Sequence, residues 1–186
     1  MTTYVALLRG INVGGNNRVA MPELRGVVES LGYGDVVTYI NSGNVVFDAA
    51  DEQDMDDATH ARVIEAAVRK ELGVTCAVLV RSASELAEVI DANPFGHEKD
   101  PKKLHAVFLP APWGDATYVD VQTARDRAAE KGSRDEVELV GRVAYLWTPD
   151  GFGRSVLAPL LARSATKDGT ARNWATVTKL LELSAR

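Results

Sequence analysis

Apolar residues recur along this chain at two spacings, and each spacing predicts one kind of secondary structure. Compact apolar or β-branched runs are typical of strands, whereas apolar residues three and four positions apart are typical of helices. In the first part of the chain the predicted strands are Tyr4–Leu8, Val36–Ile40, Val45–Phe47 and Thr75–Val80, and the predicted helices run from Met21 to Gly32 and along Val63–Leu72. The order strand, helix, strand, strand, helix, strand is the ferredoxin-like pattern.

A second series of the same kind follows a connecting segment. Ser82–Glu85 has the sequence of a capping box that opens a helix, and this helix must end before Pro94 because the residue before proline resists helical backbone angles. The later elements are predicted strands at Leu104–Leu109, Glu136–Val140 and Val143–Trp147, and predicted helices at Tyr118–Lys131, along Val156–Leu161, where Pro159 delays or kinks the helix, and from Trp174 after an Asn173 cap. A last strand is weak in the sequence and is placed within residues 166–172.

We therefore expect an α+β protein of two tandem ferredoxin-like units with antiparallel sheets. The second unit is expected to have a weak or missing last strand and an extra C-terminal helix. The predicted domains are residues 1–81, a connecting helix and linker over residues 82–103, and residues 104–186.

Two polar stretches rich in glycine and asparagine each join an apolar strand, at Leu8–Arg18 and at Tyr39–Asn44. Right-handed crossovers make the first two strands of such a unit parallel, so both stretches are expected at the same edge of the sheet. Backbone N–H groups and neutral amides gathered there suit a polar or anionic ligand. In the second unit the same reasoning brings together residues 110–115, Gly141 with Arg142, and residues 166–173.

The predicted ligand-binding residues are Arg9, Asn12, Gly14, Gly15, Asn17, Arg18, Asn41, Ser42, Asn44, Arg172 and Asn173. Arg172 is included because a cation before a helix is electrostatically misplaced unless an anion or an acidic group lies nearby, and Lys167 is its expected helper. Arg172 and Asn173 are expected to join the site if the two units pack edge to edge. A second interpretation remains open, in which these residues only permit left-handed backbone and tight turns. The glycine spacing imitates a phosphate-binding P-loop, but Asn16 and Asn17 replace the lysine and the hydroxyl residue that the motif requires.

Composition narrows the function without identifying it. The chain has 186 residues and a net charge of −5, which disfavours nucleic acid as a partner. Cys76 is interpreted as a small hydrophobe, and His60, His97 and His105 lack metal-ligand spacing, so no metal and no cofactor are predicted. No apolar run is long enough to span a membrane, and a cytoplasmic location is expected. The acidic stretch Asp48–Asp57 is interpreted as a solvated linker whose carboxylates suit the start of a helix.

Four motifs resemble a bacterial family known as domain of unknown function 1697. They are Leu7–Gly15, Tyr39–Phe47, Asn93–Phe95 and Thr170–Trp174, they occur in the family's order, and the resemblance extends over essentially the whole chain. The resemblance implies two tandem ferredoxin-like α+β units and implies almost nothing about activity. The family usually has Gly-Gly-Lys-Asn-Lys in the first loop, so Asn16 removes one expected cation, and it often has glutamine at the position of Asn41.

The function that we expect is binding of a small polar or anionic ligand, such as a nucleotide or a phosphate-bearing metabolite, at the glycine- and asparagine-rich loops. One alternative is an enzyme that acts on such a ligand in the same cleft, which needs an ionisable group with a perturbed pKa. Another is an interaction module for nucleic acid or protein that uses an exposed sheet face. No catalytic residue is predicted.

Overall fold

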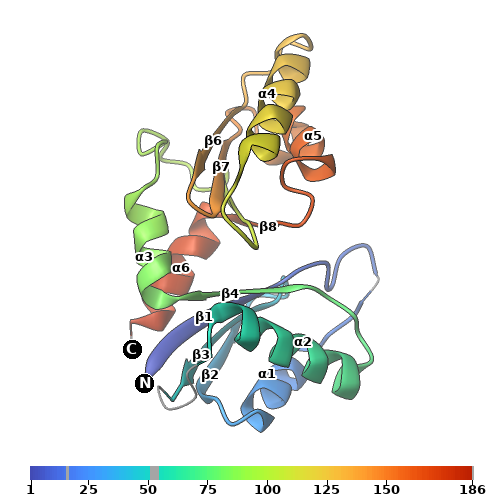
Figure 1. The fold of residues 1–186 in the computed structure, drawn as a ribbon, viewed down its shortest axis with the longest axis vertical. Helices are drawn as coiled ribbons and strands as arrows, with labels where there is room; N and C mark the ends of the chain where they lie inside the picture. Colours follow the sequence, from blue (N-terminus) through green and yellow to red (C-terminus); the bar gives the residue numbers. More distant parts are fainter. Residues whose placement is uncertain (16, 51–54, 186) are drawn as a thin grey trace. The chain divides into compact units, whose positions relative to one another are not determined.

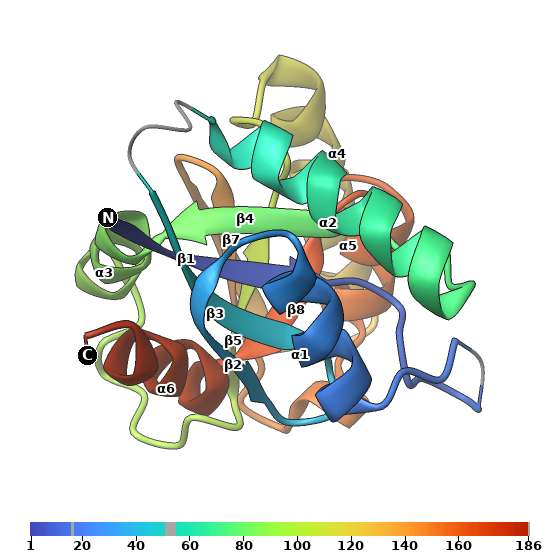
Figure 2. The same cartoon turned by 90° about the horizontal axis from the view of Figure 1, so that it is seen from below.

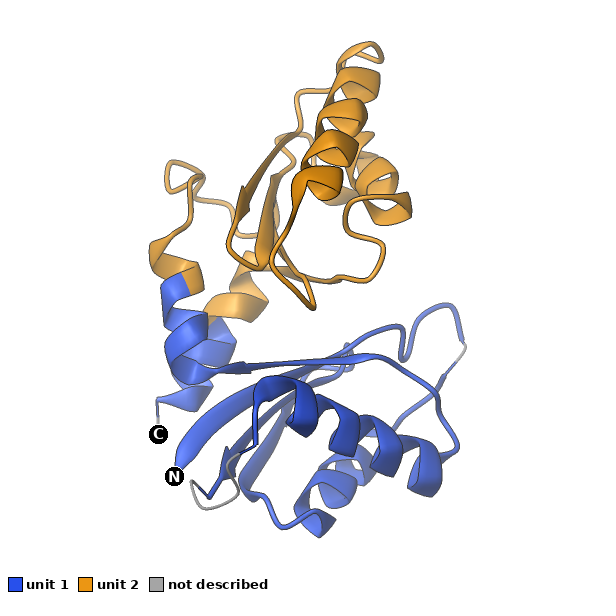
Figure 3. Cartoon of the chain, in the orientation of Figure 1, with its two compact units in different colours: residues 1–88, 179–186 blue, residues 89–178 orange. Residues whose placement is uncertain are grey.

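The computed structural model of this chain describes residues 1–15, 17–50 and 55–185. The chain forms two compact units, of which the first comprises residues 1–88 with 179–186 and the second comprises residues 89–178 (Figure 3). Each unit is built on one four-stranded antiparallel sheet, so the expected α+β class and the two tandem units are confirmed. The domain boundaries at residues 81 and 103 stay a prediction. No helix in the described ranges is both long and apolar enough to cross a membrane.

The first unit has two helices over one face of its sheet (Figures 1 and 2). Its elements are β1 (Thr2–Leu8), α1 (Met21–Ser30), β2 (Gly34–Tyr39), β3 (Asn44–Ala49), α2 (Asp57–Leu72), β4 (Val78–Ser82) and the start of α3 (Ala83–Asp91). The strands lie in the order β2-β3-β1-β4, and every neighbouring pair is antiparallel. Because β1 and β2 are both antiparallel to β3, they run in the same direction, as the crossover argument requires.

β1 is central and buried on both faces, which explains why its sequence is continuously apolar. Ala6 and Leu8 pack in the core beneath α1 and α2, whereas Val5 and Leu7 point to the opposite face and are equally buried. Asp56 caps α2 by accepting a hydrogen bond from the backbone N–H of Thr59. Hydrogen bonding to Thr59, first through its side chain and then through this backbone N–H, holds the pKa of the Asp56 carboxyl below its usual value. The predicted use of carboxylates at this helix start is thus confirmed at Asp56, while residues 51–54 lie outside the described part.

The second unit repeats the arrangement. Its elements are β5 (Leu104–Phe108), α4 (Asp115–Ala129), β6 (Glu136–Val140), β7 (Val143–Trp147), a short 3₁₀ helix η2 (Phe152–Arg154), α5 (Leu157–Arg163), β8 (Thr170–Asn173) and the start of α6 (Trp174–Ser184). The strand order β6-β7-β5-β8 matches that of the first unit, and α4 and α5 cover one face. The expectation of a weak or missing last strand is wrong, because β8 pairs with β5 along its whole length.

The predictions for β4, α4 and Pro159 need correction. β4 extends to Ser82 and begins at Val78, not Thr75, because pairing with β1 carries Arg81 and Ser82 into the sheet although both are polar. α4 begins at Asp115, three residues before the predicted start. Pro159 lies in the first turn of α5, where its missing N–H costs no helical hydrogen bond, so it does not kink the helix.

The two units also share the way in which their last strand passes into a helix. Ser82 and Glu85 form the predicted capping box, in which the Ser82 N–H donates to the Glu85 carboxylate and the Glu85 N–H donates to the Ser82 hydroxyl. At the start of α6 the side chain of Asn173 accepts from the Thr176 N–H at 2.8 Å, which confirms the predicted cap. A buried arginine precedes each cap, Arg81 in β4 and Arg172 in β8.

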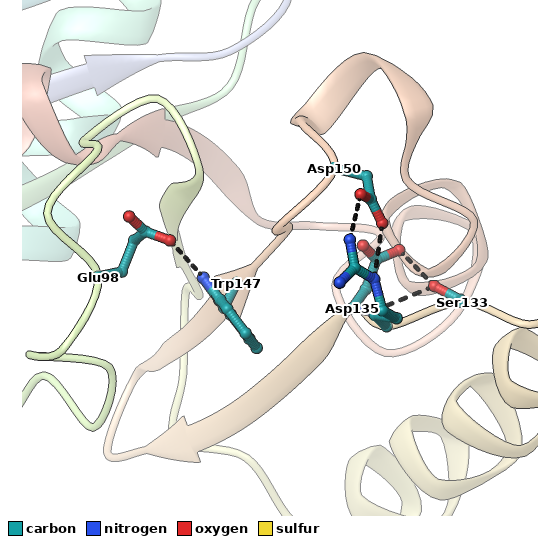
Figure 4. Close-up of polar contacts among 6 residues, drawn as sticks. Glu98, Ser133, Asp135, Trp147 and Asp150 are labelled. Carbon is teal, nitrogen blue, oxygen red and sulfur yellow. Dashed lines mark hydrogen bonds and ion pairs between the residues drawn. The ribbon is translucent and has the colours of Figure 1, made fainter.

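The segment between α3 and β5 is fastened to the second unit. The Glu98 carboxylate accepts from Trp147 Nε1 at 2.9 Å (Figure 4), and this bond is the main reason why the pKa of Glu98 is lowered. The Phe95 ring stacks on Trp147 with centroids 6.1 Å apart. Before β6, Asp135 accepts from Ser133 Oγ at 2.7 Å (Figure 4). Asp135 also accepts from the Leu157 N–H, which holds the start of α5.

Candidate functional site

The first loop and the first hairpin lie side by side, as the crossover argument predicts. The Leu8 N–H donates to the Gly43 carbonyl at 2.8 Å. The Asn12 side chain donates from Nδ2 to the Asn41 carbonyl at 2.9 Å. These two bonds join the segment after β1 to the turn between β2 and β3, so the two predicted clusters form one edge of the first unit.

Gly43 makes this close approach feasible. Its φ of 79° is left-handed, and a Cβ built there would lie 2.6 Å from Ile11 Cδ1 and 2.9 Å from Leu8 Cβ. Both distances are shorter than van der Waals contact. The glycine of the predicted hairpin is therefore required by the packing of the first loop against the turn, in addition to the turn itself.

The asparagine side chains at this edge make hydrogen bonds to other groups of the protein. Asn12 donates to the Val19 and Asn41 carbonyls and accepts from the Val19 N–H, so both of its N–H donors are used. Asn17 donates from Nδ2 to the Gly10 carbonyl at 3.2 Å. Asn44 is fully buried, and its Nδ2 donates to the Tyr39 carbonyl and the Ser42 hydroxyl. Three of the amides predicted to bind a ligand thus have internal partners.

The backbone of the first loop explains its unusual composition. Gly10, Asn12, Gly14, Gly15 and Asn17 all have positive φ values, between 49° and 82°. Glycine adopts this conformation without strain, and asparagine tolerates it better than most residues. The left-handed turns account for these residue types even in the absence of a ligand.

Cationic side chains and exposed backbone remain at the edge. Arg9 and Arg18 are exposed, and within the described part of the chain neither guanidinium has an ion-pair or hydrogen-bond partner. Gly14 and Gly15 are also exposed, and their N–H groups make no hydrogen bond with another described residue. Asn16, the position of the missing family cation, lies outside the described residues.

The two site residues predicted in the second unit both lie in β8. Arg172 is buried, its Nη1 donates to the Ala171 carbonyl at 2.8 Å, and loss of hydration lowers its pKa to about 10. Asn173 is occupied in capping α6. The second unit repeats the contact between strand end and hairpin, because the Leu109 N–H donates to the Arg142 carbonyl at 2.8 Å. A ligand-binding role for Arg172 and Asn173 stays a prediction.

A buried histidine cluster at the other end of β1 was not predicted as a site. The His60 side chain is almost fully buried, and its Nδ1 lies 2.7 Å from the hydroxyl of Tyr33. Burial lowers the pKa of His60 and raises the pKa of Tyr33 to about 12, so the imidazole is neutral and the phenol is protonated near pH 7. The ring of Tyr4 packs 4.6 Å from the imidazole. The sequence carries a signal for this burial, because His60 lies four residues before Ile64 and therefore on the same, buried face of α2.

His60 and Arg9 do not form one site. His60 lines a pocket of about 310 Å³ together with Tyr4 and Asp56. Tyr4 and Arg9 are five residues apart in sequence, which corresponds to about 16 Å along an extended strand. Cys76 is half-buried and packs against the core, and burial raises the pKa of its thiol to about 11. Within the described ranges no three His, Cys, Asp or Glu residues are grouped to hold a metal ion.

Comparisons with known proteins agree with this fold. The family described as "Protein of unknown function (DUF1697)" matches residues 1–145, while the Thr170–Trp174 motif lies beyond that range. No match was found among curated proteins. The conserved bacterial protein SP0830 from Streptococcus pneumoniae has a similar solved structure, with a TM-score of 0.68, 22% identical residues and 98% of each chain covered, and this similarity concerns the fold alone. Because the family match covers more than half of the sequence, this chain belongs to the DUF1697 family.

Proposed function

We propose that the edge made by the Gly10–Arg18 loop and the Asn41–Asn44 turn binds a small anionic or polar ligand, with a nucleotide or a phosphate-bearing metabolite as the chemical class. The observation that supports this most directly is the pair of exposed cations, Arg9 and Arg18, which have no anionic partner in the described part of the chain. A guanidinium forms bidentate, charge-assisted hydrogen bonds with phosphate or carboxylate. The exposed N–H groups of Gly14 and Gly15 add backbone donors of the kind that surround anions in other loops.

The internal bonds of the asparagines sharpen this proposal. Because Asn12, Asn17 and Asn44 hold the loop in place, their proposed role is to shape the edge, and Arg9 and Arg18 are proposed as the residues that contact the ligand. A charged ligand is favoured over a neutral one, since guanidinium groups gain most from a negative partner. Asn41 and Ser42 are exposed beside the loop and supply further polar contacts.

Ferredoxin-like topology is proposed for both units. The support is the sheet order 2-3-1-4 in each unit, with a helix after the first strand and another after the third. This arrangement places the first loop and the first hairpin at one edge. The proposed ligand site therefore uses the part of the first unit where its loops converge.

The enzyme alternative has weaker support. It needs an ionisable group with a perturbed pKa in the same cleft, whereas His60 lies near the opposite end of β1. The interaction-module alternative would use an exposed face of a sheet. The described sheet of the first unit has buried apolar side chains on both faces of β1, so it offers no such face along its central strand.

Binding can be tested with inorganic phosphate and AMP as probes, by titration calorimetry and backbone NMR shifts at low salt. Replacing Arg9 and Arg18 together by alanine is expected to weaken phosphate binding at least tenfold, because both cations are lost. Arg69→Ala is the matched control, since Arg69 is exposed on α2 and has no anionic partner in the described chain. Equal weakening in the control, or saturable binding that the double variant leaves unchanged, would contradict the proposed site.

A further inference from the structure

The second unit has a pocket of its own at the edge where its loops converge. The pocket measures about 290 Å³ and lies between the loop after β5, the first turns of α4 and the turn before β8. Pockets for small metabolites usually begin at about 300 Å³. The size therefore suits a compact molecule with few atoms beyond one or two rings.

The walls of this pocket are held rigidly. Pro110 and Pro112 restrict the backbone of the loop on one side. On the other side Gly169 packs so closely that a Cβ there would lie 2.8 Å from Val107 Cγ1 and 3.0 Å from the Phe108 carbonyl oxygen. A site that is already formed loses little conformational entropy when it binds a ligand.

One wall is aromatic and exposed. Trp113 lines the pocket and keeps 38% of its surface accessible, whereas Trp147 is half-buried and bonded to Glu98. Trp113 Nε1 has no hydrogen-bond partner in the described part of the chain. Tyr118 lies with its ring centroid 6.3 Å from that of Trp113, and its neighbour Val119 is 60% exposed. Exposed apolar side chains that gather beside a pocket are typical of a binding surface.

The pocket also carries charges of both signs that do not neutralise one another. Lys167, Asp120 and Asp168 all line it. Among the described residues none of the three forms an ion pair or a side-chain hydrogen bond. A ligand with only one kind of charge would meet an attractive and a repulsive partner in the same pocket. A ligand with both charges can satisfy each of them.

We propose that this pocket binds a small zwitterion with a planar ring, such as an aromatic amino acid or a related metabolite. The ring stacks on the Trp113 indole, the carboxylate meets Lys167, and the ammonium group meets Asp120 and Asp168. Aromatic stacking stabilises such a complex beyond the contribution of the apolar area that is buried. The site uses second-unit residues only, so it is independent of the anion site proposed at Arg9 and Arg18.

The experiment compares four probes by NMR titration of the 186-residue chain, reading the indole N–H signals and ligand saturation transfer. L-phenylalanine carries the ring and both charges, phenethylamine lacks the carboxylate, indole lacks both charges, and glycine lacks the ring. L-phenylalanine is expected to bind at least tenfold more tightly than each of the other three and to shift the Trp113 indole signal. Absence of any shift at millimolar L-phenylalanine, or indole binding as tightly as L-phenylalanine, would overturn the proposal.

Variants separate the two parts of the ligand. Trp113→Ala is expected to weaken L-phenylalanine at least tenfold, and Trp113→Phe is expected to restore most of that loss. Lys167→Ala is expected to weaken L-phenylalanine and leave phenethylamine unchanged, because only the former has a carboxylate. Lys131→Ala is the matched control, since Lys131 is exposed just beyond α4 and does not line the pocket. Binding that Trp113→Ala and Lys167→Ala leave unchanged would place the ligand elsewhere and refute the assignment.

Discussion

The loop edges of the two units share one topology and differ in what the loops contain. In the first unit a long loop of glycines and asparagines follows β1, and its amides bond back to the protein. In the second unit a short loop with two prolines and Trp113 follows β5 and borders a pocket. The comparison teaches that strand order decides where loops meet. Loop length and composition decide whether the protein's own side chains occupy that place or a pocket is left there.

Substituting the glycine of each hairpin tests the difference between the two units with the largest expected effect. Gly43→Ala is expected to lower the free energy of unfolding by about 3 kcal/mol, because the left-handed backbone costs about 1 kcal/mol and the overpacking against Leu8 and Ile11 costs the rest. Gly141→Ala is the equivalent change in the second unit. Its Cβ would meet no atom within 4 Å, so only the backbone cost of about 1 kcal/mol is expected. Chemical denaturation measures both, and equal losses would show that the loop does not press on the first hairpin.

His105 shows how the two units differ at an equivalent position of their first strands. It occupies the place in β5 that Tyr4 occupies in β1, since the two pair with Asn173 and Ser82 in their respective sheets. Burial lowers the His105 pKa from 6.5 to about 4, so between these values the unfolded chain binds more protons than the folded one. The stability contributed by the neutral ring is complete above pH 6.5 and falls as pH decreases, by about 2 kcal/mol between pH 7 and pH 5.

His105→Leu is expected to remove that part of the pH dependence. Denaturant unfolding of both proteins at pH 7 and pH 5 measures the difference. His60 titrates with the same sign in the first unit, so the variant keeps a smaller slope. An unchanged slope would mean that His105 is not protonated differently in the folded and unfolded states.

Ile40 is expected to give the smallest effect. It follows β2 at the first hairpin with a φ of 48°, a backbone conformation that a β-branched residue rarely adopts, and it is 48% exposed. Ile40→Asn is expected to raise the free energy of unfolding by about 1 kcal/mol, because asparagine tolerates the left-handed region. Val140→Asn at the second hairpin is the control, since Val140 lies in β6 and has no positive φ. Destabilisation by Ile40→Asn would show that the side chain contributes packing that outweighs the strain.

Much of the fold could be predicted because local chemistry and topology agree. The apolar runs located seven of the eight strands in the described part of the chain, and the crossover rule correctly placed Asn12 beside Asn41. β8 was underestimated because Thr-Ala-Arg-Asn is polar, and its strand character comes from pairing with β5 and burial of Arg172. Propensity cannot anticipate such an effect, since the partner strand lies far away in sequence.

The candidate site was harder to predict at the level of single side chains. The sequence showed that amides gather at one edge, but an amide that binds a ligand and an amide that binds its own backbone have the same sequence pattern. Asn44 illustrates this, because its burial and its bond to the Tyr39 carbonyl follow from tertiary packing. In the second unit the predicted meeting of residues 110–115 with residues 166–173 is confirmed, since Trp113 and Lys167 line one pocket. The sequence could not show that a pocket is left there, because its walls come from three segments that are separated by up to about fifty residues.

Residues 179–186 belong to the first unit, although all of the second unit separates them from residues 1–88 (Figure 3). A ribosome therefore delivers the final piece of the first unit only after the second unit has been synthesised. The chain therefore cannot complete its two units in simple vectorial order, because part of the earlier unit is synthesised last.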